Sequence, residues 1–90
     1  MTQQINIRKL DNTTFEVSVE GSTTTTHVVT VNPDYARKIA GTSEAERLVR
    51  ASFEFLLARE SNTSILRRFD LPLIGHYFPE YEQQIGSLLQ

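Results

Sequence analysis

Residues 43–60 read Ser-Glu-Ala-Glu-Arg-Leu-Val-Arg-Ala-Ser-Phe-Glu-Phe-Leu-Leu-Ala-Arg-Glu and lie in the longest run of the chain without glycine or proline. Nearly every residue of this stretch is compatible with a helix. Its small and apolar side chains fall on one broad side at helical spacing, whereas Arg47, Arg50 and Glu54 fall on the other. An arc of this width predicts a helix that is covered from more than one direction, so we expect the rest of the chain to pack around it.

Capping residues predict where two helices begin. Ser43 is followed three residues later by Glu46, which is the spacing of a capping box at the start of the central helix. Asn32-Pro33 predicts an N-cap and first residue for a shorter helix over 33–40, because proline suits the first helical position. Gly41 suits the exit from that helix.

Alternating side chains predict three strands before the helices. These strands cover about residues 4–10, 13–20 and 23–31, joined by turns at Asp11-Asn12 and Gly21-Ser22. The second pattern is the clearest, since apolar and polar residues alternate throughout it. The side chains that share strand faces are Ile5 with Ile7, then Phe15, Val17 and Val19, then His27, Val29 and Val31. We expect a three-stranded antiparallel meander.

Short helical segments are expected after the central helix. The residues Ile65, Leu66 and Phe69 lie at helical spacing, with Thr63 or Ser64 as a cap. Asp70 and Pro72 restart the chain, and Pro79 opens a last helix. The apolar positions of that last helix are Tyr81, Ile85, Leu88 and Leu89.

The expected fold class is therefore α+β in a single domain over residues 1–90. A three-stranded antiparallel meander is followed by a short helix, one long central helix over about 43–60, and short C-terminal helices that cover one face of the sheet. The two sheet edges leave room for pairing with a second copy of the chain.

Composition removes several functional classes. The 90 residues carry no cysteine, which excludes disulfides, thiolate nucleophiles and cysteine-ligated zinc. The net charge of −2, with 9 basic and 11 acidic residues, disfavours a dedicated nucleic-acid binder without excluding a local basic patch. No signal peptide and no apolar run long enough to span a bilayer are visible, so we expect a cytoplasmic protein that does not enter the membrane.

No pattern in the chain indicates catalysis, a metal or a cofactor. His27 and His76 are far apart in sequence, and neither stands in a metal-ligand spacing. No nucleophile elbow and no glycine-rich phosphate loop is present. We therefore predict that the protein is not an enzyme and binds no cofactor, with one alternative: a small-ligand binder or enzyme built around His27 or His76. The threonine run at 23–26 is typical of an exposed strand.

The segment 65–81 is the densest in proline, aromatic residues and arginine. Aromatic residues together with arginine are favoured at the centres of protein interfaces, although they also fill the gaps between short helices. The candidate interaction surface consists of Arg67, Arg68, Asp70, His76, Tyr77 and Tyr81. We expect Arg67 or Arg68 to form an ion pair with Asp70, or the three to form a capped turn. The leading hypothesis is a non-catalytic interaction or regulatory module that acts through a protein partner or by self-association.

The same segment resembles the C-terminal signature of a family of small, mostly uncharacterised bacterial proteins. The matching residues are Arg68-Phe69-Asp70-Leu71, Ile74 and Tyr77-Phe78-Pro79-Glu80-Tyr81. The family's other mark is similar to Glu46-Arg47-Leu48-Val49 with Phe53-Glu54-Phe55-Leu56 in the central helix. The resemblance covers about residues 13–82 and implies no activity, because no established function is associated with that family.

A second resemblance is to antitoxins of the HicB type, in which a strand meander precedes one amphipathic helix. Their acidic, glycine-containing segment is not found here, and residues 32–41 take its place. This resemblance implies a DNA-binding antitoxin or transcriptional regulator as an alternative function. It requires basic side chains to gather on one face, across a dimer. The side chains in question are Arg8, Lys9, Arg47, Arg50 and Arg59.

Overall fold

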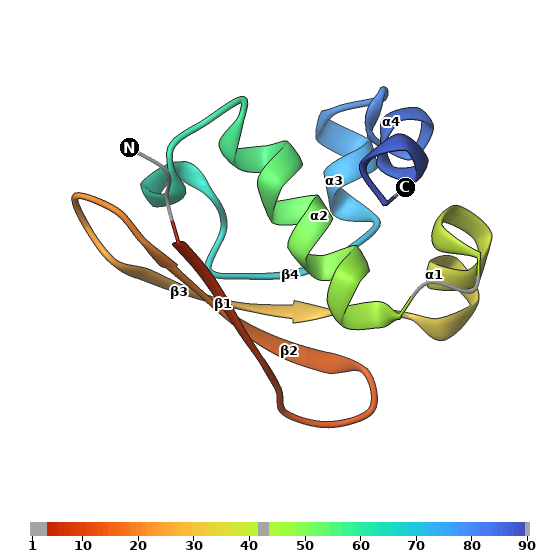
Figure 1. Ribbon diagram of the computed structural model, residues 1–90, viewed down its shortest axis with the longest axis horizontal. Helices are drawn as coiled ribbons and strands as arrows, with labels where there is room; N and C mark the ends of the chain where they lie inside the picture. The colour runs from red at the N-terminus through yellow and green to blue at the C-terminus, as the bar shows by residue number, and fades with distance from the viewer. Residues whose placement is uncertain (1–3, 42–43, 90) are drawn as a thin grey trace.

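The predicted meander is confirmed, and a fourth strand extends it (Figure 1). The computed structural model describes residues 4–41 and 44–89. The strands are β1 (Gln4–Lys9), β2 (Thr14–Glu20), β3 (Thr25–Thr30) and β4 (Arg68–Asp70), in the spatial order β1-β2-β3-β4. The first three pair antiparallel, whereas β4 runs parallel to β3. The α+β class is therefore correct, with one strand more than expected.

The helices gather on one side of the sheet (Figure 1). They are α1 (Pro33–Ala40), α2 (Ala45–Leu57), α3 (Leu73–Tyr77) and α4 (Tyr81–Leu88), with a 3-10 turn at Asn62–Ser64. The long helix α2 lies across the sheet, and α4 contacts both α1 and α2. The predicted central position of α2 is confirmed, because it packs on strands on one side and on a helix on the other.

Alternation on β2 and helical spacing on α2 build the core. Phe15, Val17 and Val19 are almost fully buried, as their period of two predicts. The α2 side chains that are buried with them are Leu48, Val49, Ala51, Ser52, Phe53, Phe55 and Leu56. Burying a large apolar side chain stabilises the fold by about 1.5–3 kcal/mol relative to leaving it exposed. Both elements thus contribute large buried side chains to one hydrophobic core.

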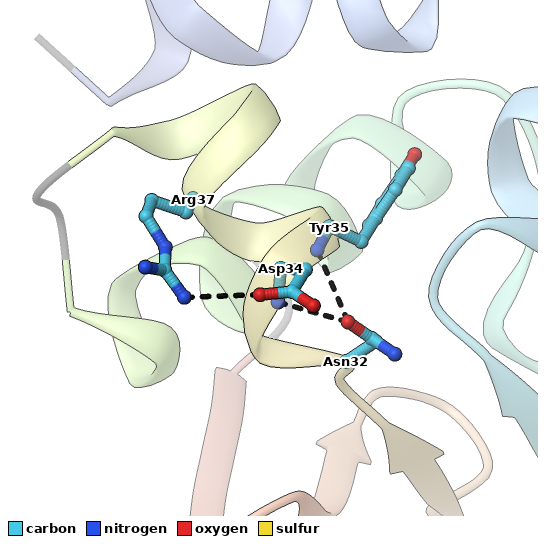
Figure 2. Close-up of polar contacts among 4 residues, drawn as sticks. All are labelled: Asn32, Asp34, Tyr35 and Arg37. Carbon is cyan, nitrogen blue, oxygen red and sulfur yellow. Dashed lines mark hydrogen bonds and ion pairs between the residues drawn. The ribbon is translucent and has the colours of Figure 1, made fainter.

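The start of α1 follows the predicted capping chemistry (Figure 2). The side-chain oxygen of Asn32 accepts hydrogen bonds from the backbone N–H groups of Asp34 at 2.8 Å and Tyr35 at 3.2 Å. Arg37 pairs with Asp34 one turn earlier, at 3.1 Å. Gly41 ends the helix with φ of 61°, a backbone angle that glycine adopts without steric cost. The predicted boundaries of this helix are confirmed.

The central helix is shorter than predicted at both ends. Ser43, the predicted cap, lies outside the described residues; α2 begins at Ala45 after Glu44, whose side chain makes no capping hydrogen bond. At the other end the amides of Arg59 and Glu60 both bond to the carbonyl of Leu56, at 2.9 Å. This tightened turn closes the helix before residue 60.

The predicted two-residue turn at Gly21-Ser22 is wrong. The last β2–β3 pair is Val19 with Thr25, so the chain forms a longer loop between them. A two-residue turn starting with glycine needs a positive φ there, and among the described glycines only Gly41 has one. The threonine run is divided accordingly: residues 23 and 24 lie exposed in the loop, whereas Thr25 is buried.

The predicted helical turn over 65–69 is also wrong, because the backbone is extended at Ile65 and β4 begins at Arg68. Leu71 N–H donates to the carbonyl of Thr30 at 2.9 Å, which fixes the parallel pairing beside β3. The Phe69 ring packs against Phe53, with ring centroids 6.1 Å apart. The strand β4 has only three residues, and its hydrogen bonds to β3 hold it at the edge of the sheet.

The remaining helix starts differ from the prediction by one or two residues. Neither Thr63 nor Ser64 caps a helix; their hydroxyl groups bond to Ser61 instead. Helix α3 follows Pro72 without a side-chain cap, and α4 begins two residues after Pro79. Three of the four predicted apolar positions of the last helix are buried, namely Tyr81, Ile85 and Leu89, whereas Leu88 remains 48% exposed.

Candidate functional site

An apolar groove lies beside β4, between the end of α2 and α3, and we call it the β4 groove. Its volume is about 420 Å³. The buried residues of its lining are Leu56, Ile65, Phe69 and Ile74, and those that remain exposed or half-buried are Glu60, Ser64, Leu66, Leu73, Tyr77 and Phe78. The sequence-based candidate surface contained only Tyr77 from this set. The helical spacing of Leu66 with Ile65 and Phe69 predicted that Leu66 lies on the buried face of a helix, whereas it lines a groove.

The backbone of β4 has one open side. The side that faces β3 is closed. There the carbonyl of Arg67 accepts a hydrogen bond from Val28 N–H at 2.7 Å, and Phe69 pairs with Val29. Backbone groups alternate in direction along a strand, so the N–H and C=O groups of the two flanking residues, 68 and 70, point away from β3. In the described part of the chain, no strand pairs with β4 on that side and no turn or loop backbone group bonds to residues 68 and 70. We call this open edge together with the β4 groove the β4 surface.

Five of the six predicted surface residues are exposed. Arg67, Arg68, Asp70 and His76 lie on the outside, and Tyr77 is 63% exposed. The predicted ion pair is wrong, because no salt bridge in the described residues joins either arginine to Asp70. The two arginines occupy consecutive positions at a strand start, where successive side chains point to opposite faces.

Tyr81 was the sixth predicted residue, and its placement on an exposed surface is wrong. It is fully buried, and its hydroxyl forms a 2.6 Å hydrogen bond with Ser52 Oγ on α2. Its ring meets Phe55 edge to face at 5.2 Å between centroids. Burial raises the pKa of Tyr81 to about 12, with the nearby Glu82 charge adding to the effect. This tyrosine attaches α4 to α2 and is a structural residue.

His27 lies at the centre of a buried chain of polar groups. The carbonyl of Leu66 can only accept, so Nδ1 of His27 carries the proton and donates to it at 2.8 Å. Nε2 then accepts from Thr25 Oγ1 at 2.8 Å, and that oxygen accepts from Asn62 Nδ2 at 3.1 Å. Asn62 Nδ2 also donates to the carbonyl of Thr23 at 2.7 Å. The chain ties the β2–β3 loop to the segment leading into β4.

This burial predicts that acid weakens the fold through His27. Burial lowers the pKa of His27 most, the Arg67 charge lowers it further, and the Leu66 carbonyl opposes both. The unfolded chain, with a histidine pKa near 6.5, therefore binds a proton before the folded chain does. The contribution of His27 to stability is complete above pH of about 6.5 and is lost as pH falls below that value towards the folded pKa.

Urea unfolding between pH 7.5 and 5 measures this effect. The midpoint is expected to fall over this range in the wild type and in His76→Gln, because His76 is exposed. In His27→Gln the fall is expected to be smaller, since the titrating group is absent. Equal slopes in all three proteins contradict the prediction.

The arginines required by the DNA-binding alternative make separate contacts within the chain. Arg47 Nη2 donates to the carbonyl of Leu89 at 2.6 Å, and Arg50 Nη1 donates to that of Ile5 at 2.9 Å. The guanidinium of Arg59 lies 3.6 Å from the centre of the Phe55 ring. Arg8 pairs with Glu16 at 3.4 Å. Arg47 thus attaches α2 to the end of α4, Arg50 attaches it to β1, and Arg59 packs back onto α2 from just after its end.

The histidine-based alternative is not supported by the two pockets that the described residues line. His27 is fully buried, and neither described pocket includes it or His76. No cluster of three or more histidine, aspartate or glutamate side chains that could hold a metal occurs in the described residues. We take the β4 surface as the candidate binding site.

Comparisons with protein-family models, with curated proteins and with solved structures find no match to this chain. The resemblance of residues 68–81 to a bacterial family signature, and the weaker one to HicB-type antitoxins, therefore stay predictions. Among the described residues, no helix combines the length and the apolar character needed to cross a membrane.

Proposed function

We propose that the protein is a non-catalytic interaction module whose working surface is the β4 surface. The observation that supports this function is an open strand edge directly beside an apolar groove. Extended segments of other chains bind such edges through backbone hydrogen bonds, while pockets next to the edge select their side chains. A cytoplasmic location is part of the proposal, because a cysteine-free chain needs no oxidising compartment.

The exposure of apolar side chains at the groove supports binding. Four large apolar residues of the described chain are strongly exposed, and two of them, Leu66 at 49% and Tyr77 at 63%, line the β4 groove. The other two, Leu10 and Leu88, line neither described pocket. Scattered apolar residues are ordinary on a protein surface, whereas clustered ones mark binding sites.

Photo-crosslinking in the cell of origin tests this function. A photoreactive phenylalanine analogue at position 77 places the probe on the groove wall, and the same analogue at Leu10 is the matched control on an exposed apolar residue elsewhere. We expect a discrete adduct from position 77 and none from position 10. Leu66→Asp in the position 77 protein is expected to reduce the adduct at least about tenfold, because a charge cannot be buried cheaply against a partner.

Folding of the Leu66→Asp variant is checked by its urea midpoint. Since Leu66 is about half exposed, the free energy of unfolding is expected to change by less than about 1 kcal/mol. Adducts of equal yield from positions 77 and 10, or a position 77 adduct that survives Leu66→Asp, contradict a binding role for the β4 groove.

A further inference from the structure

We infer that the occupant of the β4 surface is a second copy of this chain, joined through antiparallel pairing of the two β4 strands about a two-fold axis at Phe69. This inference rests on the proposed function and names its partner. It merges the two four-stranded sheets into one continuous eight-stranded sheet.

Backbone direction limits the possible registers. Only residues 68 and 70 of β4 present outward N–H and C=O groups, and antiparallel hydrogen-bonded pairs form between outward-facing residues. Three symmetric arrangements satisfy this condition: residue 68 opposite 70, residue 68 opposite 68, or residue 70 opposite 70. In the first, both outward residues of each strand are paired, which gives four backbone hydrogen bonds around the axis.

Charge selects the first of these registers. With residue 68 opposite residue 70, Arg68 of each chain faces Asp70 of the other, so two opposite-charge cross-strand pairs form. The other registers place two arginines or two aspartates directly opposite each other, and like charges in that position are destabilising. The third register also brings residue 68 opposite Pro72, which has no N–H to donate.

Neither charge has an ion-pair partner within the described chain. Arg68 and Asp70 are both exposed, on the strand positions opposite to the buried Phe69. A short charged edge is also how monomeric proteins prevent pairing. Charges of one sign serve that purpose, whereas the Arg-Phe-Asp order is complementary to itself when the strand is reversed.

The groove extends the contact beyond the strands. Phe69 lies on the helix-covered face and lines the β4 groove together with Leu66 and Tyr77. Placing the axis at Phe69 brings the two grooves to the same junction, so their exposed apolar walls face each other. The dimer buries these side chains, which gives it a hydrophobic contribution in addition to the backbone hydrogen bonds.

The opposite edge of the sheet, formed by β1, is less suited to pairing with a second copy. The carbonyl of Ile5 on the β1 edge is occupied by Arg50 of α2, at 2.9 Å. A strand added at Ile5 would therefore compete with a hydrogen bond that the monomer already makes. A two-fold contact at β4 alone gives a closed dimer and not a fibre.

A charge-exchange cycle measured by sedimentation equilibrium tests the inference. The wild type is expected to show a reversible monomer–dimer equilibrium. Arg68→Asp alone and Asp70→Arg alone each turn both cross-strand pairs into like-charge pairs, and each is expected to raise the dimer dissociation constant at least about tenfold. The double exchange Arg68→Asp/Asp70→Arg restores opposite charges and is expected to return the constant to within about threefold of wild type.

Equal urea midpoints for all variants are required to interpret the cycle. Lys9→Glu, an exposed position on β1 at the opposite edge of the sheet, is the control substitution and is expected to leave the dissociation constant unchanged. A wild type that is monomeric at about 1 mM overturns the inference. A dimer whose single exchanges have no effect, or whose double exchange does not restore association, overturns the register. If the chain is monomeric and the position 77 probe still captures a different protein, the proposed function stands and only the self-association fails.

Discussion

Replacing Tyr81 by alanine is expected to lower the free energy of unfolding by about 4 kcal/mol, whereas Tyr77→Ala is expected to change it by less than about 1 kcal/mol. The two tyrosines lie four residues apart, but Tyr81 is fully buried and Tyr77 is 63% exposed. Loss of the Tyr81 ring leaves a cavity next to Phe55 and removes the hydroxyl that bonds to Ser52. Most of the loss comes from that cavity.

Urea unfolding of both variants and of Tyr81→Phe separates the ring from the hydroxyl. The phenylalanine variant keeps the ring and loses the 2.6 Å hydrogen bond to Ser52, so a loss of about 1 kcal/mol is expected. A Tyr77→Ala variant that is destabilised as much as Tyr81→Ala shows that the assignment of one tyrosine to the core and the other to the groove wall is wrong.

Replacing His27 by alanine is expected to cost about 3 kcal/mol of unfolding free energy. The change removes a fully buried ring that lies 5.4 Å from Phe53, between centroids. It also leaves the carbonyl of Leu66 without its 2.8 Å donor and interrupts the chain of hydrogen bonds through Thr25. Unpaired buried polar groups are costly because the low-dielectric interior offers them no substitute for water.

His76→Ala provides the matched control, because His76 is exposed and its ring lies edge to face with that of the neighbouring Tyr77, at 5.5 Å between centroids. Its expected effect is within about 0.5 kcal/mol. For a domain of this size, each 1 kcal/mol shifts Tm by about 4–8 °C, so thermal unfolding separates the two variants clearly. Equal Tm values for the two alanine variants contradict the proposed buried network.

Local patterns predicted the elements whose stability depends on neighbouring residues in sequence. The alternation through Phe15, Val17 and Val19 predicted β2, and Asn32-Pro33 with Gly41 predicted both ends of α1. In each case a short-range rule, period two or a helix cap, matches the contact that the folded chain makes.

The β4 strand was not predictable by those rules. The three residues Arg68-Phe69-Asp70 are too few to show alternation, and their pairing partner β3 lies far away in sequence. The spacing of Ile65, Leu66 and Phe69 matched a helical turn equally well. Pairing with the distant strand β3 selected the strand over the helical turn. The same pairing sets the position of the β4 groove.

For two residues, the sequence pattern indicated correctly that the side chain is buried. His27 shares its strand face with Val29, so its burial followed from the alternation. Tyr81 stood at helical spacing with Ile85, which indicated the core, whereas its aromatic type and its neighbours suggested an interface. Periodicity was the better guide for both residues. It shows which face of a strand or helix a side chain occupies, whereas residue type alone does not.

The parallel pairing of β3 with β4 also sets an order of events during synthesis. The chain must pass through α1 and α2 before Arg68–Asp70 is available to cover β3. At ribosomal elongation rates this interval lasts roughly 2–8 s. Throughout it the valine-containing edge of β3 is open on the nascent chain, and polysomes bring several such edges close together. The last strand to be made therefore covers the edge of β3 and replaces it with the short, charged edge of β4.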